Sequence, residues 1–360
     1  MTKALTRWGS AVVAGALVAT VLSQGMTTLA ASRHNRAGKA SVTLLETGST
    51  LLYPLFNIWV PAYTKTHPGV RITTAGTGSG TGIGEATKGE VQIGASDAYL
   101  PPVHPAALMN IPLAISAQMV NYNLPGLNGK HLKLSGPVLA GIYSGKITKW
   151  NAPQIRALNP GVKLPGHTII PLRRVDASGD TFIFTQYLTF SAGKGWTAGY
   201  GTSISWPALG SEVSENGNSG MVSGLEQNKY SVAYIGVSYE NETSKAGMGE
   251  ALLKNRAGNF VLPETSTVVA AAQARVGSTP KSEALSLVFA PGKNSYPIIN
   301  YEYAIVSKRQ ANTTVAGAVR AFLDWALTAG NGAKFLNQVH FRPLPPAIVK
   351  MSKAQIAQIH

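Results

Sequence analysis

Four short segments of the sequence combine glycine with hydroxyl-bearing residues next to runs of apolar residues, and three of the four also contain charged residues. They are segments 46–51, 76–84, 94–98 and 173–181. A loop that opens a helix leaves backbone N–H groups unpaired and carries the positive end of the helix dipole, so it can bind an anion. The chemistry that these segments predict is recognition of an anion by backbone amides, hydroxyl groups and a guanidinium.

The segment 173–181 carries the most functional groups of the four. Arg174 could make a two-pronged contact with an oxyanion, and Asp176 could orient its guanidinium. Ser178, with the amides of Gly179 and Asp180, could open a helix toward the same anion. A surface ion pair followed by a helix cap would use the same residues. We favour the anion site.

The other three segments allow two interpretations each. Ser49 and Thr50 could donate hydroxyl groups to an anion, or one of them could cap the following helix. Asp97 follows an apolar strand and could likewise cap a helix. Segment 76–84 contains no G-x-G-x-x-G and no Lys after a Gly, so it indicates neither dinucleotide nor nucleoside triphosphate binding. It predicts a flexible turn whose amides approach an anion, or a mobile surface loop.

Patterns typical of enzymes are weaker. The seven His residues include no pair at i, i+3 or i+4, and the chain has no Cys, so no helical metal site, thiolate nucleophile or Fe–S cluster is indicated. The nucleophile pattern G-x-S-x-G is absent. Paired carboxylates for glycoside hydrolysis stay open, because 16 acidic residues allow many pairs in space. We expect no metal and no cofactor.

The strands and helices that the sequence predicts determine where these four segments lie in the fold. Apolar runs predict strands at 42–45, 70–74 and 93–95, and helical spacing from Leu52 to Tyr63 predicts a helix that ends at 66–69. The stretch 75–84 is predicted as a glycine-rich loop that leads into a helix at 85–88. Further helices are expected after Ser135 and over 315–327. This rhythm is typical of an α/β sheet with crossovers.

Composition sets the class of the protein. The chain has 360 residues, of which 44% are apolar and 13% charged, so it can bury sizeable cores and two domains are expected. Its formal net charge is +15, but the basic residues are scattered along the chain. A nucleic-acid binder would concentrate them on one stripe, so we expect no nucleic-acid partner.

The N-terminus has the pattern of a secretory signal peptide. Lys3 and Arg7 precede an apolar run over 8–22, and small residues follow at 28–32. We expect a signal peptide over 1–32 and a polar spacer over 33–39, although the uncharged stretch 8–32 is also long enough for an uncleaved anchor. Because the chain lacks Cys, it is not a lipoprotein. The protein is expected to work outside the cytoplasmic membrane.

From about residue 42 to its end, the chain resembles the substrate-binding protein of the bacterial phosphate ABC transporter. The four segments occur in the family's order, and 145–151 and 297–303 are also similar to family segments. The resemblance looks closest to the actinobacterial branch, especially at 178–180. It implies a two-lobe periplasmic-binding-protein fold of type II-like architecture, with a ligand cleft between the lobes and two crossover hinge strands. Lobe I would comprise 40–119 and 300–360, and lobe II would comprise 120–299.

The same resemblance implies where phosphate binds. One lobe would contribute Ser49, Thr50, the amide of Leu51, Ser79 and Asp97; the other would contribute Arg174, Ser178, Gly179 and Asp180, with Asp176 in support. Many family members carry a hydroxyl-bearing residue at position 180, where this chain has a carboxylate. We therefore expect two acidic acceptors, Asp97 and Asp180, which a protonated phosphate can satisfy and fully ionised sulfate cannot.

The resemblance implies a receptor, not an enzyme. It would capture inorganic phosphate, work as a monomer, and hand its ligand to the membrane permease subunits of the phosphate ABC transporter. Three alternatives remain: a secreted phosphate-ester hydrolase, a receptor for another tetrahedral oxyanion, and a surface adhesin with a vestigial pocket.

Overall fold

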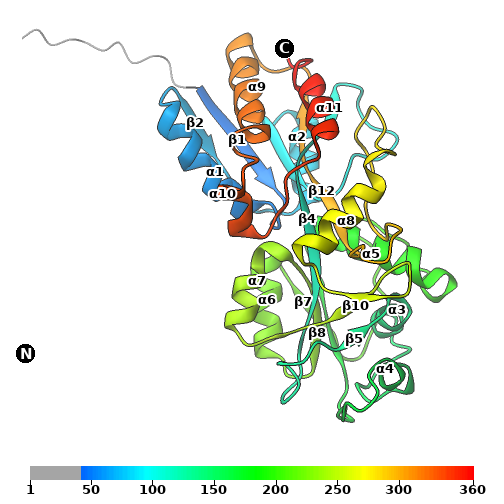
Figure 1. The fold of residues 1–360 in the computed structure, drawn as a ribbon. Coiled ribbons are helices and arrows are strands. Elements are labelled where there is room, and N and C mark those ends of the chain that lie inside the picture. The colour runs from blue at the N-terminus through cyan, green and yellow to red at the C-terminus, as the bar shows by residue number, and fades with distance from the viewer. Residues whose placement is uncertain (1–41) are drawn as a thin grey trace, which may run out of the picture. The chain divides into compact units, whose positions relative to one another are not determined.

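The computed structural model describes residues 42–360, and these form one compact unit. The predicted signal peptide and spacer, residues 1–39, lie outside the described residues. A nine-stranded mixed sheet runs through the described part of the chain in the order β2-β1-β3-β12-β4-β8-β6-β7, with β9 also paired to β4 (Figure 1). In residues 42–360 no helix combines the length and the apolar character needed to cross a membrane.

The first half of the sheet comes from both ends of the described chain. Parallel pairing joins β1 to β2 and to β3, and β12 runs antiparallel to β3 and β4. The strands are β1 (Val42–Gly48), β2 (Val70–Thr73), β3 (Ile93–Ser96), β4 (Leu108–Asn123) and β12 (Ile299–Ser307). The helices around them are α1 (Tyr53–Thr66), α2 (Ser79–Lys88), α9 (Thr313–Leu327), α10 (Ala333–Leu336), η3 (Asn337–Val339) and α11 (Pro346–Ile356).

The second half of the sheet comes from the middle of the chain. Strand β8 (Ser231–Gly236) runs antiparallel to β4 and parallel to β6 (Ile170–Arg174), which is parallel to β7 (Val213–Glu215). The helices here are α3 (Gly136–Tyr143), α4 (Pro153–Leu158), α5 (Gly179–Ala192), η1 (Gly193–Gly195), α6 (Gly217–Gln227), η2 (Val237–Tyr239), α7 (Glu240–Lys245) and α8 (Thr265–Val276). The short strands are β5 (Lys133–Leu134), β9 (Gly249–Glu250), β10 (Leu252–Lys254) and β11 (Phe260–Val261), of which β11, β10 and β5 form a small sheet.

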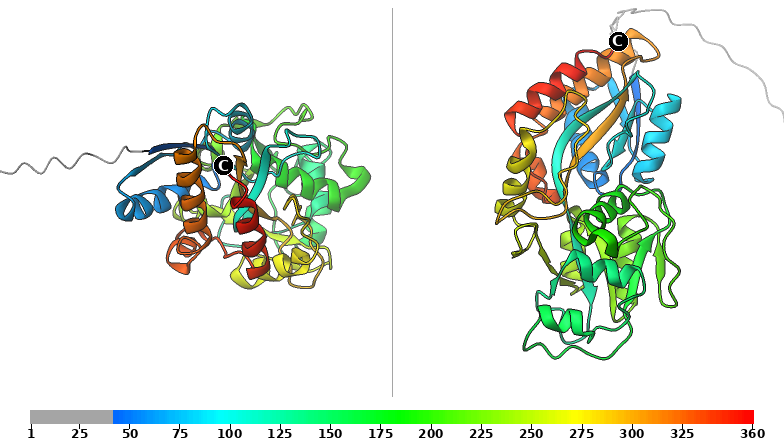
Figure 2. Two further views of the ribbon diagram at one scale, coloured as in Figure 1. Left: turned by 90° about the horizontal axis from the view of Figure 1, so that it is seen from above. Right: turned by 90° about the vertical axis from the view of Figure 1, so that its right-hand side faces the viewer.

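Strand β4 belongs to both halves of the sheet. Its first part, Leu108 to Ala117, pairs with β12, and its last part, Gln118 to Asn123, pairs with β8. All 16 residues of β4 are buried. Figure 2 shows the blue and the orange-to-red elements gathered around one end of this strand and the green elements around the other. The mixed α/β class is therefore as expected, whereas the residue boundaries of two lobes stay a prediction.

The first helix illustrates how local sequence sets an element. Leu55, Phe56, Trp59 and Tyr63 recur at helical spacing and are all buried. Pro54 lies in the first turn, where the missing N–H has no intrahelical partner, and α1 ends before the breaker Pro68. Burying each of these large side chains contributes roughly 1.5–3 kcal/mol, and the aromatic rings of α1 pack against those of α9. The helix that the sequence predicted here is confirmed.

The glycine-rich loop predicted over 75–84 is wrong for most of its length. Helix α2 already begins at Ser79, and Gly82 in α2 and Gly94 in β3 allow the helix to pack closely on the sheet. A Cβ on Gly82 would lie 2.6 Å from the carbonyl oxygen of Ala95, and one on Gly94 would lie 2.2 Å from the carbonyl oxygen of Gly82. Because α2 approaches β1 and β3 this closely, its small residues reflect contact with the sheet and not mobility.

Candidate functional site

The predicted segments converge where the two halves of the sheet face each other. Ser49 follows β1 and Asp97 follows β3, so both lie beyond the carboxyl ends of neighbouring parallel strands. Helices α2, α5 and α6 begin in the same region. Residues from the first half make hydrogen bonds with residues from the second, as the contacts of Thr50 show. The arrangement therefore brings three helix N-termini and two strand ends to one place.

Arg174, the last residue of β6, lies at the centre of this cluster. Its side chain is only 1% exposed, which rules out the surface ion pair considered above. Nε donates to Asp176 Oδ1 at 2.6 Å, Nη2 donates to the other oxygen of Asp176, and Nη1 donates to Asp180 Oδ2 at 2.8 Å. Burial alone would lower the pKa of Arg174, but the two carboxylates outweigh it and hold the pKa above its ordinary value. The guanidinium is thus a fixed, permanently charged donor.

Asp180 differs from the expectation of a free acceptor. Its carboxylate accepts hydrogen bonds from Arg174, from Asn218 Nδ2 at 2.7 Å and from Gln118 Nε2 at 3.0 Å. All three partners are donors, as an ionised carboxylate requires. The side chain is completely buried. Asp180 therefore neutralises Arg174 and positions two amides, and Asp97 is left as the acidic acceptor of the cluster.

Asn218 and Gln118 are the residues that the sequence analysis missed here. Asn218, near the start of α6, donates to Thr50 Oγ1 at 3.0 Å and accepts from the amide of Gly236 at 2.8 Å. Its segment, 216–220, has the same signal as the four others: glycine and polar residues between a strand and a helix. Gln118 gives no such signal, because it lies inside a strand, at the point where β4 changes partners.

Two serines surround Asp97 on the first half of the sheet. Ser49 Oγ donates to Asp97 Oδ1, and Ser79 Oγ donates to Asp97 Oδ2 at 3.2 Å. Ser49 Oγ also accepts from the amides of Leu51 at 3.1 Å and Leu52 at 2.9 Å, so the Leu51 amide points at this hydroxyl. Burial, with the charge of Asp180 as the second cause, raises the pKa of Asp97 to about 7.

The start of α5 meets this serine–aspartate group directly. Ser178 caps the helix, since its Oγ accepts from the amide of Thr181 at 3.3 Å. A Cβ on Gly179 would lie 2.3 Å from both Asp97 Oδ2 and Ser79 Oγ. Only glycine fits at this position while the two halves of the sheet are this close.

The structure thus gathers every residue that the sequence singled out. The residues brought together are Ser49, Thr50, Leu51, Ser79, Asp97, Arg174, Asp176, Ser178, Gly179 and Asp180. In residues 42–360, no group of three His, Asp or Glu side chains is arranged to hold a metal ion.

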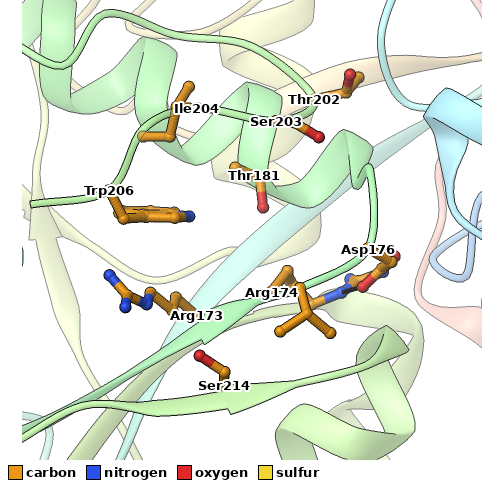
Figure 3. A pocket seen from close by; sticks show the side chains of 10 residues that line it. Arg173, Arg174, Asp176, Thr181, Thr202, Ser203, Ile204, Trp206 and Ser214 are labelled. Carbon is orange, nitrogen blue, oxygen red and sulfur yellow. Dashed lines mark hydrogen bonds and ion pairs between the residues drawn. The ribbon is translucent and has the colours of Figure 1, made fainter. Parts of the chain in front are cut away.

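A cavity of about 340 Å³ lies next to the cluster, on the second half of the sheet (Figure 3). Arg174 and Asp176 line one end, and Arg173 and Trp206 lie at the other. Arg173 is held there by Glu212, at 2.6 Å. None of the cavity's lining residues comes from the first half of the sheet, so this cavity is not the place where the predicted segments meet.

Comparisons with known proteins agree on one family. A model of the PBP superfamily domain matches residues 34–329. The phosphate-binding protein PstS of Methanocaldococcus jannaschii is 35% identical, over 84% of this chain and 82% of that one. The phosphate-binding protein PstS3 of Mycobacterium bovis is 31% identical, over 95% of both chains.

Solved structures show the same fold. A high-affinity periplasmic phosphate-binding protein, PfluDING, bound with phosphate, has a TM-score of 0.69 and 21% identity, with coverage of 87% of this chain and 93% of that chain. A putative phosphate ABC transporter substrate-binding protein from Clostridium perfringens has a TM-score of 0.61 and 17% identity, with coverage of 84% and 100%.

Proposed function

The chain belongs to the PstS family of phosphate-binding proteins, and we propose that it captures inorganic phosphate outside the cytoplasmic membrane and delivers it to the permease of an ABC transporter. The observation that carries this proposal is the convergence of Arg174, Thr50 and Asp97 from opposite halves of the sheet. A buried guanidinium, hydroxyl groups and helix N-termini in one place are suited to a tetrahedral oxyanion.

The donors of the cluster supply affinity. Arg174, the hydroxyls of Ser49, Thr50 and Ser79, and the amides at the start of α5 can all donate to phosphate oxygens, and each charge-assisted bond contributes roughly 1.5–3 kcal/mol. Ser49 and Ser79 donate to Asp97 within the first half of the sheet, and Arg174 donates to Thr50 across the two halves. Phosphate would take over those bonds, so ligand entry requires the halves to separate and then to close again.

Separation of the halves requires a hinge. Strand β4 passes from one half to the other at Gln118, opposite the start of β12 at Ile299. We propose that this crossing is the hinge between lobe I, 40–119 with 300–360, and lobe II, 120–299. The 16-residue strand is buried throughout, so the motion would be a rotation of rigid bodies about a short segment.

Asp97 supplies selectivity in this proposal. It is the acidic acceptor left over once Asp180 is paired with Arg174. A phosphate oxygen that carries a proton can donate to Asp97, whereas fully ionised sulfate has no proton to donate and would be repelled by the carboxylate, and such a mismatch can reduce binding by about 10⁴–10⁵. The sequence predicted two free acidic acceptors, Asp97 and Asp180, and this proposal keeps only Asp97 in that role.

Three further features belong to the same proposal. All ten residues come from one chain, so a monomer is sufficient to form the site.

The serine hydroxyls are engaged with Asp97 and with backbone amides, an arrangement that suits binding, so we propose a receptor and not a phosphate-ester hydrolase. Export by the signal over 1–32, with or without its cleavage, would place the protein next to its permease.

Calorimetric titration of the purified protein, stripped of ligand, tests the proposed function. We expect one-to-one binding of phosphate, no detectable binding of sulfate, and weaker discrimination between the two in Asp97→Asn. Asp324→Asn is the matched control, because Asp324 is exposed and pairs with Lys353 on the surface. A folded protein that does not bind phosphate would overturn the proposal.

A further inference from the structure

Glu302, in β12, is a second carboxylic acid directly beside Asp97. Strands β3 and β12 are antiparallel with Ser96 opposite Tyr303, so the next residues, Asp97 and Glu302, face each other. The amide of Asn300 links the two residues, because its Nδ2 donates to Glu302 Oε1 at 3.1 Å and to the carbonyl oxygen of Asp97 at 3.4 Å. Glu302 is completely buried and Asp97 is 2% exposed. Neither the anion-binding segments nor the proposed function gives this second acid a role.

One oxygen of Glu302 is well supplied with donors. Oε1 accepts from Ser116 Oγ and from Asn300 Nδ2, the latter at 3.1 Å. The other oxygen, Oε2, is buried, and no group among residues 42–360 donates a hydrogen bond to it. A buried charged oxygen without a donor is costly. A proton on Oε2 removes that cost and can be donated to Asp97, which lies opposite Glu302 on the neighbouring strand.

The charges around this pair favour the protonated acid. The groups that face Glu302 from β4 and from β12 itself, Ser116 and Asn300, are neutral, and the group from the end of β3 is the acidic Asp97. Beyond Asp97 lie Asp180 and Arg174, and the guanidinium is already shared by two carboxylates. Among residues 42–360, no cation that contacts this group is therefore left to compensate a charge on Glu302. Burial, followed by the charge of Asp97, raises the pKa of Glu302 well above its ordinary value.

We propose that Glu302 is a positioning and selectivity residue that keeps its proton and donates a hydrogen bond to Asp97. The two acids then carry one negative charge between them, and Asp97 is the one that accepts a hydrogen bond from phosphate. This inference rests on the proposed function. The shared proton limits the pair to one negative charge, so the site can accept the doubly charged form of phosphate, which still has one proton to donate to Asp97. If Glu302 lost its proton, two carboxylates would face the same anion.

The proposal predicts a decline of phosphate affinity at alkaline pH. Above the pKa of Glu302, binding would require the uptake of one proton, so affinity falls about tenfold for each pH unit. Glu302→Gln retains a donor to Asp97 and cannot ionise. Its affinity should stay level from neutral to alkaline pH, over the range in which the affinity of the wild type declines.

The experiment is phosphate titration of the purified wild type and Glu302→Gln from neutral to alkaline pH. Glu283→Gln is the matched control, because Glu283 is also completely buried but bonds to Ser352 at 2.8 Å, outside the site. It should follow the wild type at every pH. An alkaline decline that persists unchanged in Glu302→Gln, or no decline in the wild type, would overturn the proposal.

Infrared difference spectroscopy keeps the test independent of binding and of the variant's stability. A protonated carboxyl group has a carbonyl stretch that a carboxylate lacks. We expect such a band in the wild type at neutral pH, absent from Glu302→Gln, that disappears in the wild type over the pH range in which affinity falls. If the wild type does not bind phosphate, the proposed function fails while this band still tests the proton on Glu302. If phosphate binds and Glu302→Gln retains every protonated-carboxyl band, only the present inference fails.

Discussion

The guanidinium of Arg174 donates to the hydroxyl of Thr50 at 3.2 Å, although the two residues are 124 positions apart in the chain. Asn218, in α6, donates to the same hydroxyl at 3.0 Å. Backbone contacts accompany them, since the amide of Gly80 donates to the carbonyl of Ala177 at 2.7 Å. The groups proposed to bind phosphate are therefore also groups that hold the two halves of the sheet together. Ligand binding and closure would then be one event.

Gly179→Ala should impair phosphate binding through closure alone. The added Cβ would meet Asp97 and Ser79 at 2.3 Å, so the halves could close only with overpacking that costs about 1–3 kcal/mol. We expect a loss of affinity of about tenfold or more, measured by calorimetry, with little change in the unfolding midpoint. Gly84→Ala is the control, because a Cβ there meets nothing within 4 Å. Equal affinity of both variants would contradict the closed arrangement described here.

Arg174→Lys should lose both affinity and stability. A lysine is a point charge and cannot hold Asp176 and Asp180 in the fork geometry of the guanidinium. Breaking a buried ion pair typically costs about 3–5 kcal/mol, so denaturant unfolding should report a loss approaching that range. Arg173→Lys is the matched control, because Arg173 is the neighbouring residue in the chain and pairs with only one, partly exposed carboxylate, that of Glu212. A variant at 174 as stable as the one at 173 would argue against the buried network.

Asn218→Ala tests a residue found from the structure alone. Its removal leaves Asp180, Thr50 and the amide of Gly236 each without one partner. Leaving buried polar groups unsatisfied costs about 1–3 kcal/mol of unfolding free energy, and phosphate affinity should fall with it. Asn228→Ala, at the other end of α6, removes a helix-terminal bond to Gly224 and should leave affinity unchanged. Wild-type phosphate binding by Asn218→Ala would remove Asn218 from the site.

Glu46 should make stability depend on pH. Burial raises the pKa of this carboxyl group from 4.5 to about 8, so the folded state binds the proton more tightly than the unfolded chain. The stabilising effect of the protonated acid is complete below pH 4.5 and is lost as pH rises to about 8, on the order of 5 kcal/mol in total.

Denaturant unfolding at several pH values checks this effect. Glu46→Gln should flatten the decline in unfolding free energy between pH 4.5 and about 8. The surface variant Glu90→Gln should not, because Glu90 is exposed and only 3.8 Å from Lys88 in a solvent-facing pair. The same slope in Glu46→Gln as in the wild type would show that Glu46 is ionised in the folded protein.

Local patterns were sufficient for the elements and for most of the donors. Apolar spacing predicted α1 and α9, breaker residues predicted where α1 ends, and glycine with hydroxyl residues after strands marked Ser49, Thr50, Asp97 and Arg174. These features depend on neighbours a few positions apart, because helix spacing, capping and breaking act within one or two turns. The same signal was present at Asn218 and was overlooked.

Only the tertiary structure decided how these groups pair. Gly82, which the sequence predicted in a flexible loop, proved to be a packing position of α2, since the approach of α2 to β3 is set by the sheet. Asp180 became the partner of Arg174, and Glu302 became the neighbour of Asp97 through the register of β12 on β3. Strand order and register join residues that are hundreds of positions apart, and burial then decides which carboxyl groups hold a charge. The sequence by itself determined which chemical groups are available, and the fold determined which of them are already paired and which face the ligand.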